Sequence, residues 1–159
     1  MLIKMKQRIY ADTSVLGGIL DDEFKEWSIR LLEEFQMGNS ILVLSDITLQ
    51  ELEGAPDKIH KELSKIPEKN IEKLKINKDA KLLAQEYLKE GVVTEKYIVD
   101  AQHIAIASVF KVDLVVSWNF KHILNYKKIR LYNGVNLKNG YPLIEIRSPR
   151  EVVDEKEKF

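Results

Sequence analysis

The sequence predicts an α/β fold in which a mostly parallel sheet is covered by helices on both faces. Short apolar runs alternate with stretches of helical periodicity, and no internal repeat or low-complexity linker interrupts them. The run Ile41–Leu44 is apolar throughout, as expected of a strand covered on both faces. With 159 residues, the chain can form one domain with a substantial core. We assign that domain to residues 1–151 and a charged C-terminal tail to residues 152–159.

The first half of the chain is predicted to hold three strands and three helices. The strands are expected at Arg8–Ala11, at Ile41–Leu44 and, less clearly marked, across Ile71, Leu74 and Ile76. The helices are expected to begin near residues that commonly cap a helix, namely Asp22, Ser45 or Asp46, and Asp57. Their predicted ends lie at Gly38, at Leu52 before Gly54 and Pro56, and at Ile66 before Pro67.

The second half continues the alternation of helices and strands. Helices are predicted over Asp79–Lys89, ended by Gly91, and over Glu95–Phe110, with Thr94 as the cap. Strands are predicted at Leu114–Trp118 and Ile129–Tyr132, with an extra one over Pro142–Ile146. The segment Glu151–Phe159 is strongly charged and is expected to fray.

Composition excludes several kinds of chemistry. The chain has no cysteine, which rules out disulfides, zinc thiolate sites and cysteine nucleophiles, and three histidines are few for a histidine-rich metal site. The net charge of zero argues against extended binding to duplex nucleic acid. It leaves room for an enzyme that contacts a few phosphates through a bound metal.

The protein is expected to be cytoplasmic. The segment Met1–Lys6 is basic but has no long apolar stretch behind it, so we expect no signal peptide. No apolar run approaches the roughly 20 residues that a membrane span requires.

Four polar residues adjoin segments that are predicted to be core: Asp12, Glu51, Asp100 and Asn119. Burying a carboxylate costs several kcal/mol unless a cation or hydrogen bonds compensate. In parallel sheets, ligands bind beyond the carboxyl ends of the strands. Asp12, Asn119 and the helix carrying Glu51 follow strands directly, so this rule brings them to one edge. Three acids and an amide there predict metal-dependent chemistry with a hard cation, Mg²⁺ or Mn²⁺.

Each acid also has a simpler interpretation. Asp12 can be a helix N-cap, and Glu51 can be a solvated residue of a short helix. Asp100 can pair with Lys96, four residues earlier on the same helix. The three acids together are more specific than any one of them.

These motifs resemble the PIN domain and, within it, the VapC-type toxins of prokaryotic toxin–antitoxin pairs. The residues that carry the resemblance are Asp12-Thr13-Ser14-Val15, Glu51 after a strand, Asp100 followed by Ile104-Ala105-Ile106-Ala107, and Ser117-Trp118-Asn119. The resemblance runs from Arg8 to about Glu151. It implies a five-stranded parallel sheet in the order 3-2-1-4-5, with the fifth strand at Ile129. It also implies RNA cleavage dependent on Mg²⁺ or Mn²⁺, leaving a 5′-phosphate on one product, and a small antitoxin protein as partner.

The resemblance assigns roles to particular residues. Asp12, Glu51, Asp100 and Asn119 would be the catalytic residues and the metal ligands. Many family members carry a fourth acid where this chain has Asn119, so a second metal site is open to question. We also expect a set of residues to contact the substrate: Thr13, Ser14, Ser117, Lys121 and His122.

Some features of the sequence keep two interpretations. The basic stretch from Lys121 to Arg130 can steer phosphate or can be a solvated loop. Trp118 can stack on a base or end a core strand. Exposed apolar residues can receive an antitoxin or form a homodimer.

Two other functions compete with the ribonuclease. A catalytically silent binding module of the same fold is kept open by Asn119. A metal-dependent phosphatase is less favoured, because no second aspartate follows Asp12 two residues on and no phosphate-binding glycine loop is present.

Overall fold

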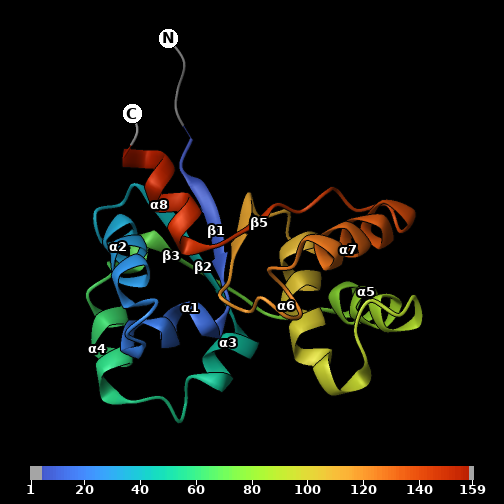
Figure 1. Ribbon diagram of the computed structural model, residues 1–159, viewed down its shortest axis with the longest axis horizontal. Helices are drawn as coiled ribbons and strands as arrows, with labels where there is room; N and C mark the ends of the chain where they lie inside the picture. Colours follow the sequence, from blue (N-terminus) through green and yellow to red (C-terminus); the bar gives the residue numbers. More distant parts are fainter. Residues whose placement is uncertain (1–4, 158–159) are drawn as a thin grey trace.

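The computed structural model describes residues 5–157 as a five-stranded parallel sheet between two groups of helices (Figure 1). The strand order is β3-β2-β1-β4-β5, and every neighbouring pair is parallel, which confirms the predicted order 3-2-1-4-5. The strands are β1 Gln7–Ala11, β2 Ser40–Ser45, β3 Ile71–Leu74, β4 Leu114–Val116 and β5 Ile146–Arg147. Residues 1–4 lie outside the described part. They belong to the N-terminal segment for which the sequence predicts no signal peptide.

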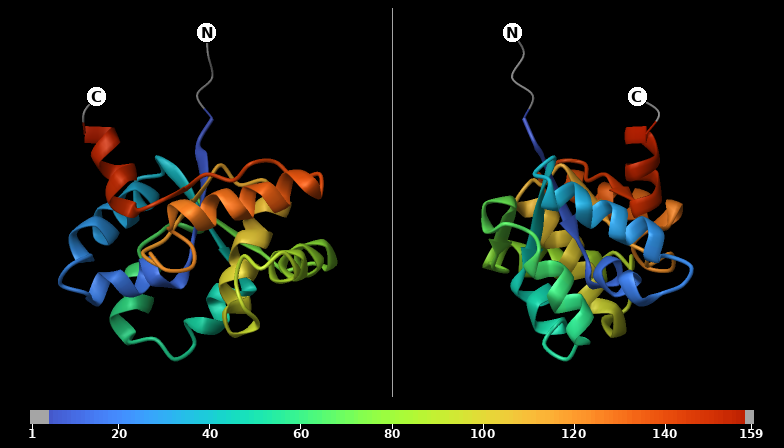
Figure 2. Two further views of the ribbon diagram at one scale, coloured as in Figure 1. Left: turned by 45° about the vertical axis from the view of Figure 1, so that its right-hand side comes forward. Right: turned by 90° about the vertical axis from the view of Figure 1, so that its left-hand side faces the viewer.

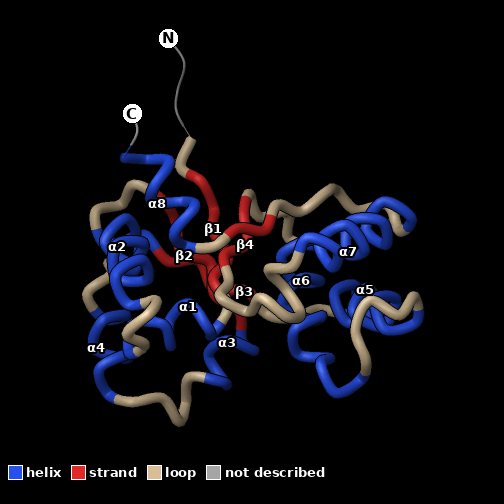
Figure 3. The backbone as a smooth tube through the Cα atoms, in the orientation of Figure 1, coloured by secondary structure: helices blue, strands red, loops and turns tan. Residues whose placement is uncertain are grey.

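Helices cover both faces of the sheet, and Figure 3 shows the strands gathered between them. One group, with α3 at the carboxyl edge, consists of α1 Thr13–Gly17, α2 Lys25–Gln36, α3 Asp46–Glu51, α4 Asp57–Ser64 and α8 Pro149–Glu157. The other consists of α5 Lys78–Lys89, α6 Ile98–Val109 and α7 Tyr126–Lys138. Short 3-10 turns occupy Gly18–Leu20, Glu68–Asn70 and Glu95–Tyr97. Within residues 5–157, no helix combines the length and the apolar character needed to cross a membrane.

Strand β1 divides the core into two clusters because its side chains alternate between the faces of the sheet. Ile9 and Ala11 pack with α1, α2 and α4, whereas Tyr10 packs with α5, α6 and α7. All three residues are fully buried. A single strand therefore connects both cores and delivers its next residue, Asp12, to the carboxyl edge.

The predicted strand at Ile129–Tyr132 is wrong, since these residues belong to α7. Asn125 caps this helix by accepting a hydrogen bond from the Lys128 backbone N–H at 3.1 Å. Tyr132 and Val135 then face the core at helical spacing. The fifth strand is instead β5, which meets the predicted extra strand at Ile146 and pairs with β4 through Val115 and Val116.

The C-terminal segment also differs from the expectation of a frayed tail. Residues 149–157 form α8, and Val152 and Val153 are buried in the core cluster that includes α2. Figure 2 shows α8 beside α2 from two directions. Residues 158 and 159 of the expected tail lie outside the described residues.

The predicted cap at Asp22 is wrong, because helix α2 begins at Lys25 with Phe24 as its N-cap. Thr94 does occupy the N-cap position before Glu95–Tyr97, but its side chain makes no capping hydrogen bond. Ser45 caps α3 by accepting a hydrogen bond from the Thr48 N–H at 3.3 Å. This cap fixes where α3 starts, and hence where Glu51 lies at its end.

Candidate active site

The candidate site lies at the carboxyl edge of the two central strands. Strands β1 and β4 are neighbours, and the Asp12 N–H donates to the Val116 carbonyl at 3.3 Å. Asp12 follows β1 directly, and Ser117 to Asn119 follow β4. The order of the strands reverses between β1 and β4, where open parallel sheets commonly bind ligands.

Asp12 is buried and held on both carboxylate oxygens. Its side chain is 4% exposed. Oδ1 accepts from the Ser14 hydroxyl at 2.5 Å and from the Val15 N–H at 3.3 Å, while Oδ2 accepts from the Ser117 hydroxyl at 2.6 Å. Burial raises the pKa of Asp12, and nearby His103 and these hydrogen bonds offset only part of that rise. Asp12 is thus the N-cap of α1 and also a desolvated carboxyl group.

Asp100 lies close enough to Asp12 for the two charges to interact. Burial is the main cause of its raised pKa, and the negative charge of Asp12 raises it further. His103, His122 and a hydrogen bond from Asn119 act in the opposite direction. The Lys96 ammonium, considered above as the partner of Asp100, lies over the Tyr97 ring at 5.6 Å from its centroid. Two mutually repelling carboxylates therefore share this edge.

Glu51 is the most accessible of the three acids. Its side chain is 39% exposed, and Oε1 accepts from the Thr13 hydroxyl at 2.8 Å and contacts His103 Nε2 at 2.8 Å. Burial alone would raise the pKa of Glu51, but the bonds with His103 and Thr13 outweigh it and leave the pKa lowered. The carboxylate is thereby held in its charged form.

Asn119 organises the loop after β4. Its Oδ1 accepts from the backbone N–H groups of Lys121 and His122 at 3.3 and 3.0 Å, and its own N–H donates to Ser117 Oγ at 2.9 Å. Because Oδ1 is turned toward the backbone, the amide NH₂ is the group available to interact with the Asp100 carboxylate, and Asn119 lowers the pKa of Asp100. This arrangement favours an orienting role over metal ligation.

Three of the residues expected to contact the substrate form hydrogen bonds with the acids in this structure. Thr13 bonds Glu51, while Ser14 and Ser117 bond Asp12. Lys121 is exposed. The stacked rings of His122 and Tyr97 lie 3.7 Å apart between centroids, and within residues 5–157 both nitrogens of His122 are buried without a hydrogen-bond partner.

The aromatic residues beside the site divide into core and surface. Trp118 is 8% exposed, donates through Nε1 to Ser28 Oγ at 2.9 Å and stacks on Phe24 with 4.2 Å between centroids. The core interpretation of Trp118 therefore holds. Phe120 follows two residues later and is 52% exposed.

Two residues that the sequence did not single out connect the acids. His103 bonds Glu51 and acts electrostatically on both Asp12 and Asp100, and its other ring nitrogen contacts the Tyr10 hydroxyl. The only sequence signal was the position of His103, three residues after Asp100 and hence on the same face of α6.

The acids suit a hydrated magnesium ion in chemistry, although they do not form a closed cage. Within residues 5–157, no group of three or more His, Cys, Asp or Glu side chains is arranged to hold a metal. Mg²⁺, however, is usually held by one or two carboxylates and keeps several waters. Asp12 and Asp100 offer two oxygen donors whose mutual repulsion a cation would relieve. The donor set therefore fits one hydrated ion better than two closely bound ions.

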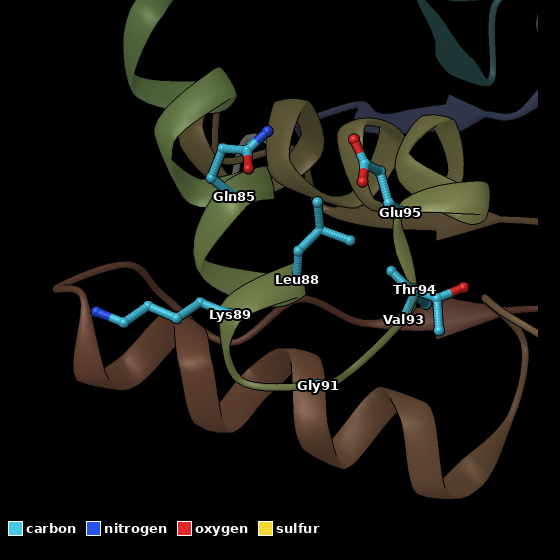
Figure 4. A pocket seen from close by; sticks show the side chains of 7 residues that line it. All are labelled: Gln85, Leu88, Lys89, Gly91, Val93, Thr94 and Glu95. Atoms are coloured by element: carbon cyan, nitrogen blue, oxygen red, sulfur yellow. The ribbon is translucent and has the colours of Figure 1, made fainter.

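A separate hollow of about 520 Å³ lies at the end of α5 (Figure 4). Its lining consists of Gln85, Leu88, Lys89, Gly91, Val93, Thr94 and Glu95. None of the four polar residues at the carboxyl edge takes part in this lining.

A parallel sheet with Asp12 beyond β1 and Asn119 beyond β4 is typical of a PIN-like α/β domain, and solved structures bear out this fold. VapBC2 from Rickettsia felis, bound to a DNA fragment from its promoter, aligns over 89% of this chain and 98% of its own, with a TM-score of 0.55 and 14% identity. VapC20 from Mycobacterium tuberculosis, a sarcin-ricin loop cleaving toxin, aligns over 67% and 86%, with a TM-score of 0.50 and 17% identity. No family model and no curated protein matches the sequence. The resemblance to VapC-type PIN domains is thus confirmed at the level of the fold.

Proposed function

We propose that this protein is a metal-dependent endoribonuclease, the toxin of a toxin–antitoxin pair. The observation that carries the proposal is the pairing of Asp12 and Asp100 beyond the central strands. Both carboxylates are desolvated, and the charge of one raises the pKa of the other. Such an arrangement is unfavourable unless a cation neutralises it, and metal-assisted phosphodiester cleavage uses such a cation.

In this proposal, Asp12 and Asp100 would hold a hydrated Mg²⁺ or Mn²⁺, Glu51 would add its negative charge at the same edge, and Asn119 would orient Asp100. An ion held there would lower the pKa of a water molecule and would stabilise negative charge on the phosphate. Ser14 and Ser117 fix the Asp12 carboxylate by donating to opposite oxygens.

The substrate surface would be the loop that follows Asn119. Lys121 on this loop can meet a phosphate, and the exposed ring of Phe120 can stack on an unpaired base. Single-stranded RNA suits a protein of zero net charge, because few phosphate contacts are needed. Such an activity belongs in the cytoplasm, where RNA is available.

The same acidic edge would receive an antitoxin. An arginine or lysine of the partner could bind a carboxylate there, neutralise the repulsion and exclude the metal. Competition predicts that the apparent affinity for the antitoxin falls as Mg²⁺ rises, beyond the effect of matched ionic strength. Unchanged affinity would mean that the partner binds elsewhere.

A silent binding module is the second candidate. It is favoured by Asn119, whose Oδ1 accepts hydrogen bonds from two backbone N–H groups, and by the lack of a closed ligand group among residues 5–157. Such a module would bind RNA without cutting it.

The deciding experiment is sequencing of RNA ends after incubation with protein and Mg²⁺. We expect discrete new ends with 5′-phosphates, absent with Asp12→Ala and absent with chelator. RNA that stays intact with both Mg²⁺ and Mn²⁺, while still binding the protein, would establish the silent module instead.

A further inference from the structure

We infer that Tyr10 and His103 are positioning residues, which fix the Glu51 carboxylate at the carboxyl edge of the sheet through a buried hydrogen-bond relay. The role in metal binding rests on the function proposed above, whereas the relay itself depends only on the hydrogen bonds. Its three members come from separate elements, β1, α6 and α3.

The relay is continuous and mostly closed to solvent. His103 is 2% exposed, and Tyr10 is fully buried. His103 Nδ1 lies 2.6 Å from the Tyr10 hydroxyl, and Nε2 lies 2.8 Å from Glu51 Oε1. The Tyr10 hydroxyl is also 2.7 Å from Ser45 Oγ. Both ring nitrogens of His103 therefore have partners, so the ring has no freedom to flip without breaking two hydrogen bonds.

The donors and acceptors that these groups offer fix the direction of the hydrogen bonds in the relay. A carboxylate only accepts hydrogen bonds, so His103 Nε2 must carry the proton that Glu51 receives. In the neutral imidazole, Nδ1 is then an acceptor and receives the Tyr10 hydroxyl proton, whereas in the imidazolium both ring nitrogens would donate. The Tyr10 oxygen in turn accepts from Ser45. Tyr10 thus fixes the tautomer of His103 that presents a donor to Glu51.

Glu51 needs this support because of its location. It is the last residue of the six-residue helix α3, and it is half-exposed. Thr13 and His103 hold the same oxygen, Oε1, so these two contacts fix the carboxylate and leave Oε2 open to another partner. Partners behind a metal-binding group typically change metal affinity by about 10- to 100-fold when they are removed.

The chain offers a matched control in Tyr87. This residue is also fully buried, and its hydroxyl bonds Asn136 and Ser108, away from the acids. Tyr87→Phe and Tyr10→Phe each delete one buried hydroxyl and keep the ring. Any difference between the two variants in the carboxyl resonance of Glu51 or in metal affinity must come from the hydrogen-bond partners of the deleted hydroxyl group.

The first arm of the test is metal-free NMR of the full chain. In the wild type, we expect the imidazole nitrogens of His103 to show the Nε2–H tautomer. Tyr10→Phe and Glu51→Gln should each shift these resonances, and Tyr10→Phe should also shift the Glu51 carboxyl carbon. Tyr87→Phe should move neither. If Tyr10→Phe leaves the resonances of His103 and Glu51 unchanged, the relay is overturned. This conclusion does not depend on whether the protein binds metal.

The second arm is Mn²⁺ affinity measured by electron paramagnetic resonance. We expect Tyr10→Phe and His103→Leu to weaken binding about 10-fold or more, with Tyr87→Phe within twofold of wild type. His103→Gln keeps a side-chain donor and should recover part of the loss. Equal affinity in wild type and Tyr10→Phe would overturn the positioning role. A wild type that binds no Mn²⁺ would refute the proposed metal function and the metal part of this inference, while the NMR arm still decides the relay.

Discussion

Tyr10 and Tyr87 are both fully buried on the same side of the sheet, yet their hydrogen-bond networks end differently. The network of Tyr10 runs through His103 to Glu51, a side chain that is 39% exposed at the carboxyl edge. The network of Tyr87 stays among helices, with Asn136 and Ser108 as its members. Burial raises the pKa of both tyrosines, so both remain donors at neutral pH.

The difference separates stability from function. Asn136 closes its network completely, since Nδ2 also donates to Ser108 Oγ at 2.9 Å and to the Pro142 carbonyl at 3.2 Å. A satisfied network of neutral groups fixes the packing of α5, α6 and α7, and it does not position any side chain of the candidate site. The network of Tyr10 ends on a charged group, so its geometry is passed to the candidate site.

The largest expected effect is on catalysis at the carboxyl edge of the sheet, where the acids lie. Asp100→Asn should lower RNA cleavage by about 10³-fold, because a ligand that contributes several kcal/mol to the transition state is lost. The same variant should melt at a higher temperature without metal. The folded state raises the pKa of Asp100, so its charged form opposes folding above that pKa, and Asn removes the charge.

Calorimetry and cleavage assays on one preparation check this prediction, with Glu53→Gln as an exposed acidic control. Cleavage by Asp100→Asn at the wild-type rate would show that Asp100 is no ligand.

The next effect concerns the closed network. Asn136→Ala should lower the free energy of unfolding by about 3 kcal/mol, since it leaves buried partners of the amide unsatisfied. Mn²⁺ affinity should stay within twofold of wild type. Urea unfolding and Mn²⁺ titration measure the two quantities, and a loss of metal affinity matching that of Tyr10→Phe would erase the contrast between the networks.

A double-mutant cycle sharpens the comparison at a smaller scale. Tyr10→Phe combined with Glu51→Gln should show a coupling of about 1 kcal/mol in the free energy of unfolding, because both belong to one network. Tyr87→Phe combined with Glu51→Gln should be additive within about 0.5 kcal/mol. Equal coupling in the two cycles would argue that neither tyrosine has a special connection to Glu51.

The smallest effect concerns the loop beyond the site. Lys121→Gln should reduce the salt dependence of RNA binding by about one unit of slope, the loss of one phosphate contact. Lys89→Gln, an exposed change at the separate hollow, should leave the slope as it is. Filter binding over a range of salt concentrations measures both, and identical slopes would remove Lys121 from the RNA surface.

Much of the fold was predictable because local signals agreed with the tertiary arrangement. The apolar run at Ile41–Leu44 is a central strand, and Ser45 caps the helix after it. Ile129–Tyr132 was mistaken for a strand because β-branched and aromatic residues favour both a short strand and a buried helix face. The cap at Asn125 decides for the helix. Strand β5 has only two residues, too short to show a period of its own.

The sequence by itself determined which polar residues stand at the carboxyl edge, since Asp12 follows β1 and Asn119 follows β4. Strand direction in a parallel sheet is enough to bring such residues together. Only the tertiary structure decided what holds them. Tyr10 and His103 are 93 residues apart, and His103 and Glu51 are 52 apart, so no local pattern reports either bond. Which buried donor meets which acceptor depends on how α6 and α3 pack against β1, and packing is a property of the whole core.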